Sequence, residues 1–319
     1  MRTHLIVALL FITFLGPDAE AKSYREFFGV DAPPDKYGAV LKTLNFQQGP
    51  VRLGSASVTL TVPDQFYYLS PTDTRKVLVD LWSNPASEAD GVLGMIFPAK
   101  YSPTDAETWG SVIDYDPSGY VSDADAATTN FDEVLQQIKD AIAEANPERE
   151  KAGFGPVTLV GWAAPPFYDK EAHALHWARE LIFGKDRNAD HQLNYSVRVL
   201  GREGVVDFDF VAGLDQLAEI NAVIPAVIKT VQYDSTKGYS DHIDGDKVAA
   251  YGLAGMIAAA AGVKIAAKLG LIALGLGLLK NFGLAILALK KGIVLLIVPI
   301  VALGRWIKAM FSRKNNSDV

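Results

Sequence analysis

Short apolar runs alternate with turn residues through the first two thirds of the chain. These runs are rich in branched and aromatic residues and are bounded by Pro, Gly, Asn, Asp or Ser, which is the pattern of β-strands. We expect strands at residues 58–62, 66–69, 91–97, 109–115, 156–162, 174–183, 194–201 and 205–211. The last of these alternates apolar and acidic residues, so we expect the face that carries Asp207 and Asp209 to be solvated.

Three segments carry apolar residues at helical spacing instead. One begins at Ser70 or Asp73 and runs to about Trp82, one runs from Thr129 or Asn130 to about Ala145, and one covers about 214–231. Strands outnumber helices, and many connections are too short for parallel crossovers. The pattern predicts an α+β fold with a mainly antiparallel sheet and packed helices, followed by a C-terminal helical membrane anchor.

The first 21 residues have the pattern of a secretory signal peptide. Arg2 precedes an apolar run from Leu5 to Leu15, and the small-x-small sequence Ala19-Glu20-Ala21 follows a Gly-Pro pair. The apolar run would rise about 16 Å as a helix, about half of a bilayer core, so an uncleaved anchor is the less favoured alternative. We expect cleavage near Ala21 and export of the residues that follow.

Beyond residue 246 the chain is apolar and interrupted by lysines. We expect a transmembrane helix at residues 287–307, which places Lys290 and Lys291 near one membrane surface and Arg305 near the other. Centring a span on the two lysines would cost about 5–7 kcal/mol. The basic tail, residues 308–319, should then stay in the cytoplasm.

The stretch between, residues 247–286, is rich in Gly, Ala and Leu and would form an amphipathic or apolar helical region. Three placements are open for it: along the membrane surface, as a second span that turns at Lys280-Asn281, or as a buried helical hairpin.

Charge is divided unevenly along the chain. Residues 22–246, which we call the head, hold 19 Lys and Arg against 34 Asp and Glu, a net charge of −15. Residues 247–319 hold 10 basic residues against one acidic residue, a net charge of +9. An acidic domain before a basic apolar tail suits a membrane protein with an exported domain, and it disfavours nucleic acid as a partner. The chain has no cysteine, which excludes thiol catalysis, disulfides and thiolate metal sites.

The acidic stretch after the strand at 109–115 is the first candidate for chemistry. Asp116, Asp123 and Asp125 lie within ten positions. An EF-hand calcium loop that starts at Asp123 would need Gly and Glu where the chain has Thr128 and Val134. We therefore favour a connector whose carboxylates cap turns, with an irregular cation site as the alternative.

Histidines offer a second possibility for metal binding. His173 and His176 would point to opposite faces of a strand, whereas on a helix they would share a metal with Glu180. The chain has no HExxH motif, no glycine-rich phosphate loop and no GxSxG nucleophile elbow. We expect neither a metal nor a cofactor.

Two further stretches carry unusual side chains. Arg202 and Glu203, flanked by glycines, predict a tight turn with a surface ion pair, and an anion-binding arginine is the alternative. The stretch from Trp162 to Tyr168 predicts an aromatic loop packed against the sheet, with ligand stacking as the alternative.

Four ordered blocks resemble a bacterial family of predicted membrane-anchored proteins that is known only as a domain of unknown function. The blocks lie at residues 119–126, 161–169, 193–204 and 246–254. The resemblance covers about residues 49–313 and implies a signal peptide, an exported domain and a C-terminal anchor. It implies no activity, but it marks the blocks as the place for a site. The candidate residues are Asp116, Tyr120, Asp123, Asp125, Trp162, Asn194, Tyr195 and Arg202.

These observations favour a non-enzymatic module of the bacterial cell envelope that acts by binding or envelope maintenance. Its expected partners are the lipid bilayer and another envelope protein, and the sequence does not decide whether it self-associates. The bulk of the chain is expected at the cell membrane on the periplasmic side, with the C-terminus in the cytoplasm. Two alternatives are a metal-dependent or hydrolytic enzyme that uses Asp116, Asp123, Asp125 or His176, and a membrane-remodelling or pore-forming protein built on the glycine-rich tail.

Overall fold

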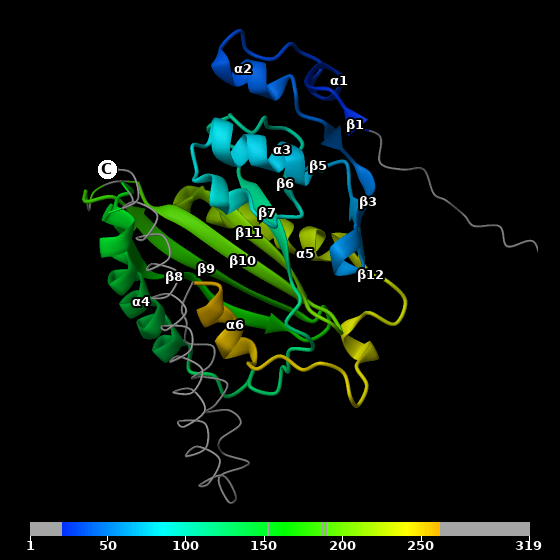
Figure 1. The fold of residues 1–319 in the computed structure, drawn as a ribbon, viewed down its shortest axis with the longest axis vertical. Coiled ribbons are helices and arrows are strands. Elements are labelled where there is room, and N and C mark those ends of the chain that lie inside the picture. Colours follow the sequence, from blue (N-terminus) through cyan, green and yellow to red (C-terminus); the bar gives the residue numbers. More distant parts are fainter. Residues whose placement is uncertain (1–20, 152, 187, 189, 262–319) are drawn as a thin grey trace, which may run out of the picture. The chain divides into compact units, whose positions relative to one another are not determined.

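Two antiparallel sheets form the framework of the computed structural model, which describes residues 21–151, 153–186, 188 and 190–261 (Figure 1). The described residues all belong to one compact unit. The larger sheet has the order β1-β2-β5-β6-β7-β11-β10-β9-β8, and the smaller has the order β12-β4-β3. The strands are β1 (Ala21–Lys22), β2 (Phe46–Gln47), β3 (Gly49–Leu53), β4 (Val58–Val62), β5 (Phe66–Leu69), β6 (Gly94–Pro98), β7 (Gly110–Asp116), β8 (Val157–Asp169), β9 (Ala174–Phe183), β10 (Gln192–Leu200), β11 (Val205–Gly213) and β12 (Val231–Tyr233).

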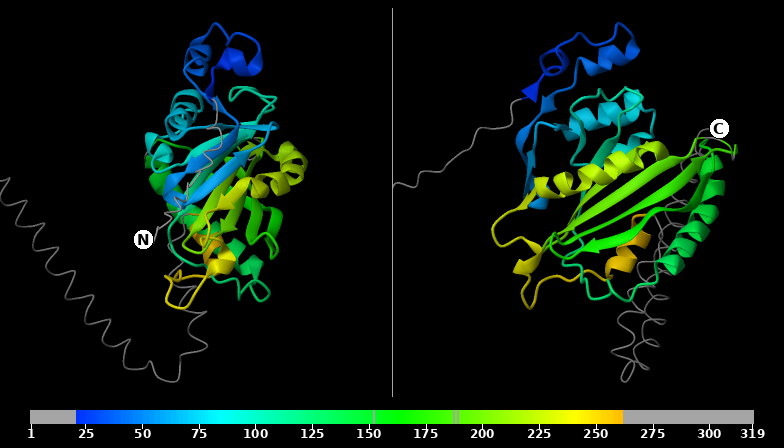
Figure 2. Two further views of the ribbon diagram at one scale, coloured as in Figure 1. Left: turned by 90° about the vertical axis from the view of Figure 1, so that its right-hand side faces the viewer. Right: turned by 180° about the vertical axis from the view of Figure 1, so that it is seen from behind.

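Helices cover both faces of the larger sheet. The α-helices are α1 (Tyr24–Phe28), α2 (Lys36–Leu41), α3 (Pro71–Arg75), α4 (Phe131–Lys151), α5 (Leu217–Thr230) and α6 (Leu253–Ala259). Shorter helical turns are η1 (Gly54–Ala56), η2 (Lys76–Leu81), η3 (Ala86–Ala89), η4 (Leu214–Gln216) and η5 (Tyr239–Asp241). Seen from behind, α5 crosses one face of the sheet, and α4 runs beside β8 (Figure 2).

Strand β5 shows why the head has two cores. All four of its residues are buried, and they alternate between the two faces of the sheet. Phe66 and Tyr68 join the core beneath α5 and the smaller sheet, whereas Tyr67 and Leu69 join the core beneath α1, α2, α3 and η2. Because burial of a large apolar side chain stabilises the fold by about 1.5–3 kcal/mol, both helical layers are held by the sheet between them.

The predicted α+β class and the mainly antiparallel sheet are confirmed. Strands at 58–62, 66–69 and 174–183 have the expected bounds. The first expected helix is α3 continued by η2, and it begins where the Ser70 hydroxyl accepts a hydrogen bond from the Asp73 amide at 3.2 Å. Asn130 caps α4 in the same way, accepting from the Asp132 amide at 3.1 Å.

The stretch from Trp162 to Tyr168, expected as a loop, is instead part of β8. The strand lies at the edge of the sheet, where proline costs no ladder hydrogen bond on the open side. Its pairing with β9 shifts register three times, between Leu159 and Phe167. These bulges accommodate Pro165 and Pro166 within a strand of 13 residues.

No helix within residues 21–261 is both long and apolar enough to cross a bilayer. The expected transmembrane helix at 287–307 and the basic tail at 308–319 lie outside the described residues. So do residues 1–20 of the expected signal peptide and residues 262–286 of the expected amphipathic region. Residues 247–261 are described, and α6 packs against α4 (Figure 1).

Candidate functional site

The candidate residues do not gather in one place. Asp116, Tyr120, Asp125 and Arg202 gather at one end of the larger sheet, where β7 and β10 end and β11 begins. Asn194 and Tyr195 lie within β10 and point to opposite faces of the sheet. The indole nitrogen of Trp162 donates to the Phe131 carbonyl at 3.4 Å, which ties β8 to the start of α4.

The first group forms a set of contacts with residues 246–254, which we call the clasp: Asp116, Tyr120, Asp125 and Arg202 with Asp246, Lys247, Ala249, Tyr251, Leu253 and Ala254. Arg202 and Asp246 are its strongest pair. The Nε and Nη2 atoms of Arg202 donate to the two carboxylate oxygens of Asp246 at 2.8 and 2.9 Å. The guanidinium holds the pKa of the Asp246 carboxyl well below its usual range. The β10–β11 turn is as expected, but Arg202 pairs with Asp246 and Glu203 pairs with Lys237.

Tyr120 attaches the same segment through its backbone. Its amide donates to the Lys247 carbonyl at 2.8 Å, and its carbonyl accepts from the Ala249 amide at 2.8 Å. The neighbouring Gly119 has a φ of +103°, and a Cβ there would lie 2.4 Å from the Lys247 carbonyl oxygen. Only glycine therefore permits this close approach of two backbones.

Aromatic rings reinforce the contact. The Tyr120 ring is stacked against His242, with ring centroids 3.8 Å apart, and against Tyr239 at 4.6 Å. The Tyr239 hydroxyl donates to the Val121 carbonyl at 3.0 Å.

Asp125 and Asp116 complete the clasp. The Asp125 carboxylate accepts from the amides of Leu253 at 3.0 Å and Ala254 at 3.2 Å, so it caps α6 from a distant part of the chain. The Tyr251 hydroxyl donates to Asp116. Burial raises the pKa of Tyr251, and the hydrogen bond to Asp116 raises it further. Both carboxylates thus bind protein groups rather than face an open cavity.

Asp123, the remaining carboxylate of the first block, lies near the hydroxyl of Tyr168. The buried Tyr168 hydroxyl has no hydrogen-bond partner of normal geometry within the described residues. Burial raises the pKa of Tyr168, and the nearby Asp123 carboxylate raises it further. No group of three or more His, Asp and Glu side chains in the described part of the chain is placed to hold a metal ion. His173 lies in a turn and His176 within β9, so the helical arrangement for a shared metal is absent from this segment.

The face of β11 that was expected to be solvated carries an ion network instead, in which the side chains of Asp207 and Asp209 are 17% and 33% exposed. Arg198 on β10 has only 5% of its side chain exposed. Its Nε lies 3.2 Å from Asp207 and its Nη2 lies 3.0 Å from Asp209. The expectation was wrong because alternation fixes which residues share a face, but not what the neighbouring strand places opposite them.

A third carboxylate belongs to this network. Asp114 on β7 is paired in register with Asp207. Burial raises the pKa of Asp207 to about 8 and that of Asp114 to about 6. Arg198 has the opposite effect on Asp209, whose pKa is lowered despite its burial. Two buried arginines, Arg198 and Arg179, lie near three carboxylates, which leaves one excess negative charge that favours a bound proton.

The two candidates in β10 have separate partners. Asn194 accepts a hydrogen bond from Arg179 through its Oδ1 atom, and its Nδ2 atom donates to the Phe210 carbonyl at 3.4 Å. The Tyr195 hydroxyl lies 2.9 Å from Nδ1 of His176 on β9.

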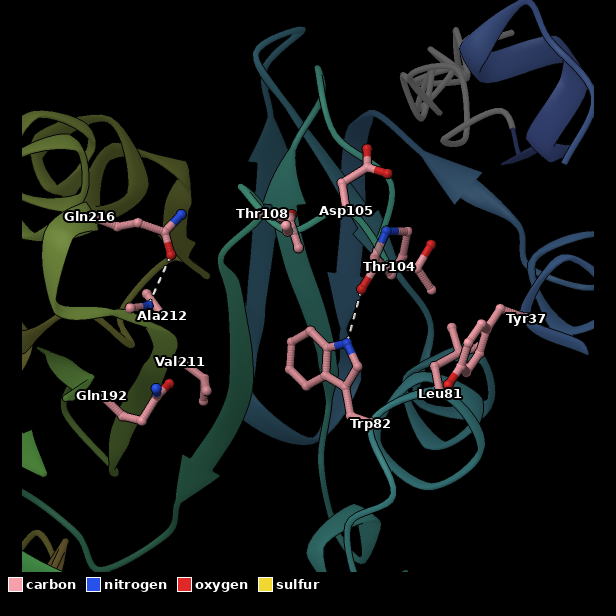
Figure 3. Close-up of a pocket in the computed structure, with 13 residues that line it drawn as sticks. Tyr37, Leu81, Trp82, Thr104, Asp105, Thr108, Gln192, Val211, Ala212 and Gln216 are labelled. Atoms are coloured by element: carbon pink, nitrogen blue, oxygen red, sulfur yellow. Dashed lines mark hydrogen bonds between the residues drawn. The ribbon is translucent and has the colours of Figure 1, made fainter. Parts of the chain in front are cut away.

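A cleft of about 450 Å³ opens at the other end of β10 and β11 (Figure 3). Gln192, Val211 and Gln216 lie on one side of it, facing Leu81 and Trp82 on the other. Its walls are fixed by hydrogen bonds: the Trp82 indole donates to the Pro103 carbonyl at 2.9 Å, and Gln216 donates to the Glu107 carbonyl at 2.8 Å. A larger hollow of about 1060 Å³ shares Gln192 and Gln216 with it and is lined by four carboxylates, those of Glu107, Asp190, Asp215 and Glu219.

Sequence reasoning missed the partners in both charged arrangements. Asp246 and Tyr251 lie in the fourth block, yet nothing in their spacing shows that they meet Arg202 and Asp116. Arg198 lies in the strand expected at 194–201 and is absent from the candidate residues. Its alternation with Ser196 and Asn194 was the one available signal, because it places polar side chains on the same face as the acidic residues of β11.

Comparisons with known proteins give a family without a function. The sequence profile of a family described as "Protein of unknown function (DUF2167)" matches residues 45–296. No curated protein matches the chain. Among solved structures, the solution structure of cyanobacterial PsbP (CyanoP) from Synechocystis sp. PCC 6803 is similar to 57% of this chain and covers 89% of its own, with 10% identity and a TM-score of 0.33. A likeness at this level carries no argument about function.

Proposed function

The chain belongs to the DUF2167 family of proteins of unknown function, and on that premise we propose that it is a non-enzymatic binding module of the bacterial cell envelope. The clasp is the observation that carries the proposal. Residues from the first, third and fourth blocks use their charged groups to hold one another, as Arg202 does with Asp246 and Asp125 with the amides of α6. Such contacts stabilise an attachment and engage the Arg202 guanidinium and the Asp246, Asp125 and Asp116 carboxylates in binding the protein itself.

The attachment supports a tethered arrangement. The clasp joins the sheet to residues 246–254, close to the end of the described chain. In this proposal residues 287–307 span the membrane, the acidic head lies on the periplasmic side and residues 308–319 lie in the cytoplasm. The charge difference between head and tail supports that orientation.

The cleft beside Trp82 and Val211 is the binding surface in this proposal. It combines exposed apolar side chains with amide groups, as protein-binding surfaces do. The adjoining hollow with four carboxylates would favour basic groups on the partner. The partner we propose is therefore another envelope protein that presents an aromatic or aliphatic side chain next to Lys or Arg.

Photo-crosslinking from full-length protein in intact membranes tests this proposal. The matched positions are Val211, 43% exposed in the cleft, and Val30, 59% exposed on the α1–α2 loop. With p-benzoylphenylalanine at each position in turn, we expect one discrete crosslinked protein from position 211 and none from position 30. Equal patterns from both positions, or no product from 211, would contradict the cleft as the binding surface.

Two further measurements test the rest of the proposal. Carbonate extraction should leave the full chain in the membrane pellet and release a chain that ends at Ala261. Metal analysis of the purified protein should find no stoichiometric ion. Bound zinc or calcium at one per chain would favour the enzyme alternative and overturn the non-enzymatic part of the proposal.

A further inference from the structure

A separate cavity of about 310 Å³ lies between α5 and the end of β8. Ile224, Pro225 and Ile228 of α5 form an apolar wall, and Phe167 of β8 lines the cavity with 57% of its surface exposed. A volume of this size equals the space of about ten water molecules, which is enough for a single substituted ring.

The polar contact in this cavity comes from His176. Its Nδ1 atom lies 2.9 Å from the hydroxyl of buried Tyr195, which has no other hydrogen-bond partner in the described part of the chain. Burial raises the pKa of Tyr195 to about 12, so the phenol keeps its proton, and Nδ1 is the acceptor within reach. If Tyr195 donates to Nδ1, the proton of the neutral imidazole is on Nε2.

The tautomer decides what the cavity can bind. His176 lines the cavity, and its Nε2 atom makes no hydrogen bond to any described residue, so Nε2–H is a free donor. Burial lowers the pKa of His176, which keeps the ring neutral near pH 7. A neutral imidazole fixed in this way offers a hydrogen bond to an oxygen acceptor.

The rim carries one cationic and one anionic side chain, those of Lys229 and Asp169. Lys229 of α5 lines the cavity and makes no ion pair with any residue that the structure describes. Asp169 also lines it, but one of its oxygens already accepts from the amides of Glu171 at 2.9 Å and Ala172 at 3.1 Å. The donors that line the cavity are therefore one imidazole N–H, one ammonium group and the side-chain amide of Asn221.

We propose that this cavity binds a small aromatic carboxylate. The ring lies between Phe167 and the apolar wall of α5, and the carboxylate accepts from His176 Nε2–H and from Lys229. This site goes beyond the proposed function, because it requires neither the envelope partner nor the membrane. It also gives Tyr195 a role as the residue that fixes the His176 tautomer.

Ligand-observed ¹⁹F NMR with the full chain in detergent tests the site. The probe is 4-fluorobenzoate, and the matched cation is 4-fluorobenzylamine. We expect saturable broadening of the benzoate signal, its reversal by unlabelled benzoate, and no saturable effect on the amine. Equal binding of the two probes, or no saturable binding of benzoate, would overturn the proposal.

Surface variants locate the binding without disturbing the core. Phe167→Ala and Lys229→Gln change exposed side chains, and each should weaken 4-fluorobenzoate binding by about tenfold. Phe183→Ala is the matched control, since Phe183 is 50% exposed in β9 but does not line the cavity. The control should bind like the unchanged protein. Binding that survives both cavity variants would place the ligand elsewhere.

Discussion

Arg202 and Asp246 form a two-pronged ion pair across 44 residues of sequence, and this pair attaches the β10–β11 turn to the segment that leads to the tail. A planar guanidinium meets both carboxylate oxygens, which an ammonium group cannot reproduce. His242 approaches the same carboxylate at 3.1 Å, so Asp246 is the centre of the clasp.

Arg202→Lys and Asp246→Asn should each lower the thermal midpoint of unfolding. Because the folded-state pKa of Asp246 is depressed, its stabilisation is present above the unfolded pKa of about 4 and is lost as pH falls through the folded value. The difference between Asp246→Asn and the unchanged protein should therefore shrink below about pH 4. Calorimetry over that range measures it.

The control for this pair is Glu203→Gln. It removes the neighbouring exposed pair with Lys237 and should cost at most about 1 kcal/mol. An equal loss of stability in Glu203→Gln and Asp246→Asn would mean that the paired hydrogen bonds between Arg202 and Asp246 stabilise the fold no more than an exposed ion pair does.

The buried ion network should make stability depend on pH in the opposite direction. The pKa of Asp207 is raised in the fold, so the stability linked to its bound proton is present below the unfolded pKa and is lost as pH rises through about 8. Asp207→Asn imitates the protonated acid and should gain relative to the unchanged protein as pH rises from about 4 to about 8, with no further gain above that. Urea unfolding at a series of pH values tests this.

Asp209→Asn is the matched variant, because it removes the carboxylate that Arg198 holds at 3.0 Å. We expect it to lose about 2–3 kcal/mol near pH 7, since Arg198 stays buried with a weaker partner. If Asp207→Asn lowers the free energy of unfolding at pH 9 more than Asp209→Asn does, Asp207 is not the carboxylate that holds the bound proton.

The cap of α6 should be separable from the rest of the clasp. Asp125→Ala leaves the Leu253 and Ala254 amides without their acceptor and should cost about 1 kcal/mol. Hydrogen exchange at those two amides should speed up, whereas Asp123→Ala should leave them unchanged. Unaltered exchange in Asp125→Ala would show that other packing holds α6 in place.

The end of the folded unit should lie beyond Asp246. A fragment of residues 22–261 should be soluble and unfold cooperatively, because it keeps α6 and the Tyr251 contact with Asp116. The head alone, residues 22–246, should fold with lower stability, since it lacks α6 and the backbone bridge to Tyr120. The midpoints of urea unfolding of the two fragments measure this difference in stability. Equal midpoints would show that residues 247–261 do not stabilise the fold.

The orientation of the chain across the membrane is a prediction from the sequence alone. A reporter fused after Val319 should be active in the cytoplasm, and one inserted near Asp186 should be active outside it. Paired fusions to an export-dependent and a cytoplasm-dependent enzyme measure this. An exported C-terminus would mean an even number of spans, with a turn at Lys280-Asn281.

The elements with strong local signals could be predicted from the sequence. Strand 174–183 and the helix that opens at Asn130 are defined by periodicity and capping, which depend only on near neighbours. The long strand β8 could not be predicted, because consecutive prolines oppose a strand unless its place at the sheet edge is known.

The candidate site could be predicted only as a set of residues. The blocks name positions, but the meeting of those positions depends on contacts between distant residues: 128 positions separate Asp125 from Leu253, and 135 separate Asp116 from Tyr251. No local pattern reports such distances. The contact between His176 and Tyr195 was not predicted either, because it depends on the register between β9 and β10.

Strand β8 has a consequence for how neighbouring copies behave. An edge strand with free N–H groups is a template on which another chain can add a strand. Pro165 and Pro166 offer no N–H groups, and the bulges around them bend the strand away from the flat geometry that such addition needs. Copies at high local concentration would therefore be protected from pairing through this edge, and the two prolines would act as a safeguard against aggregation.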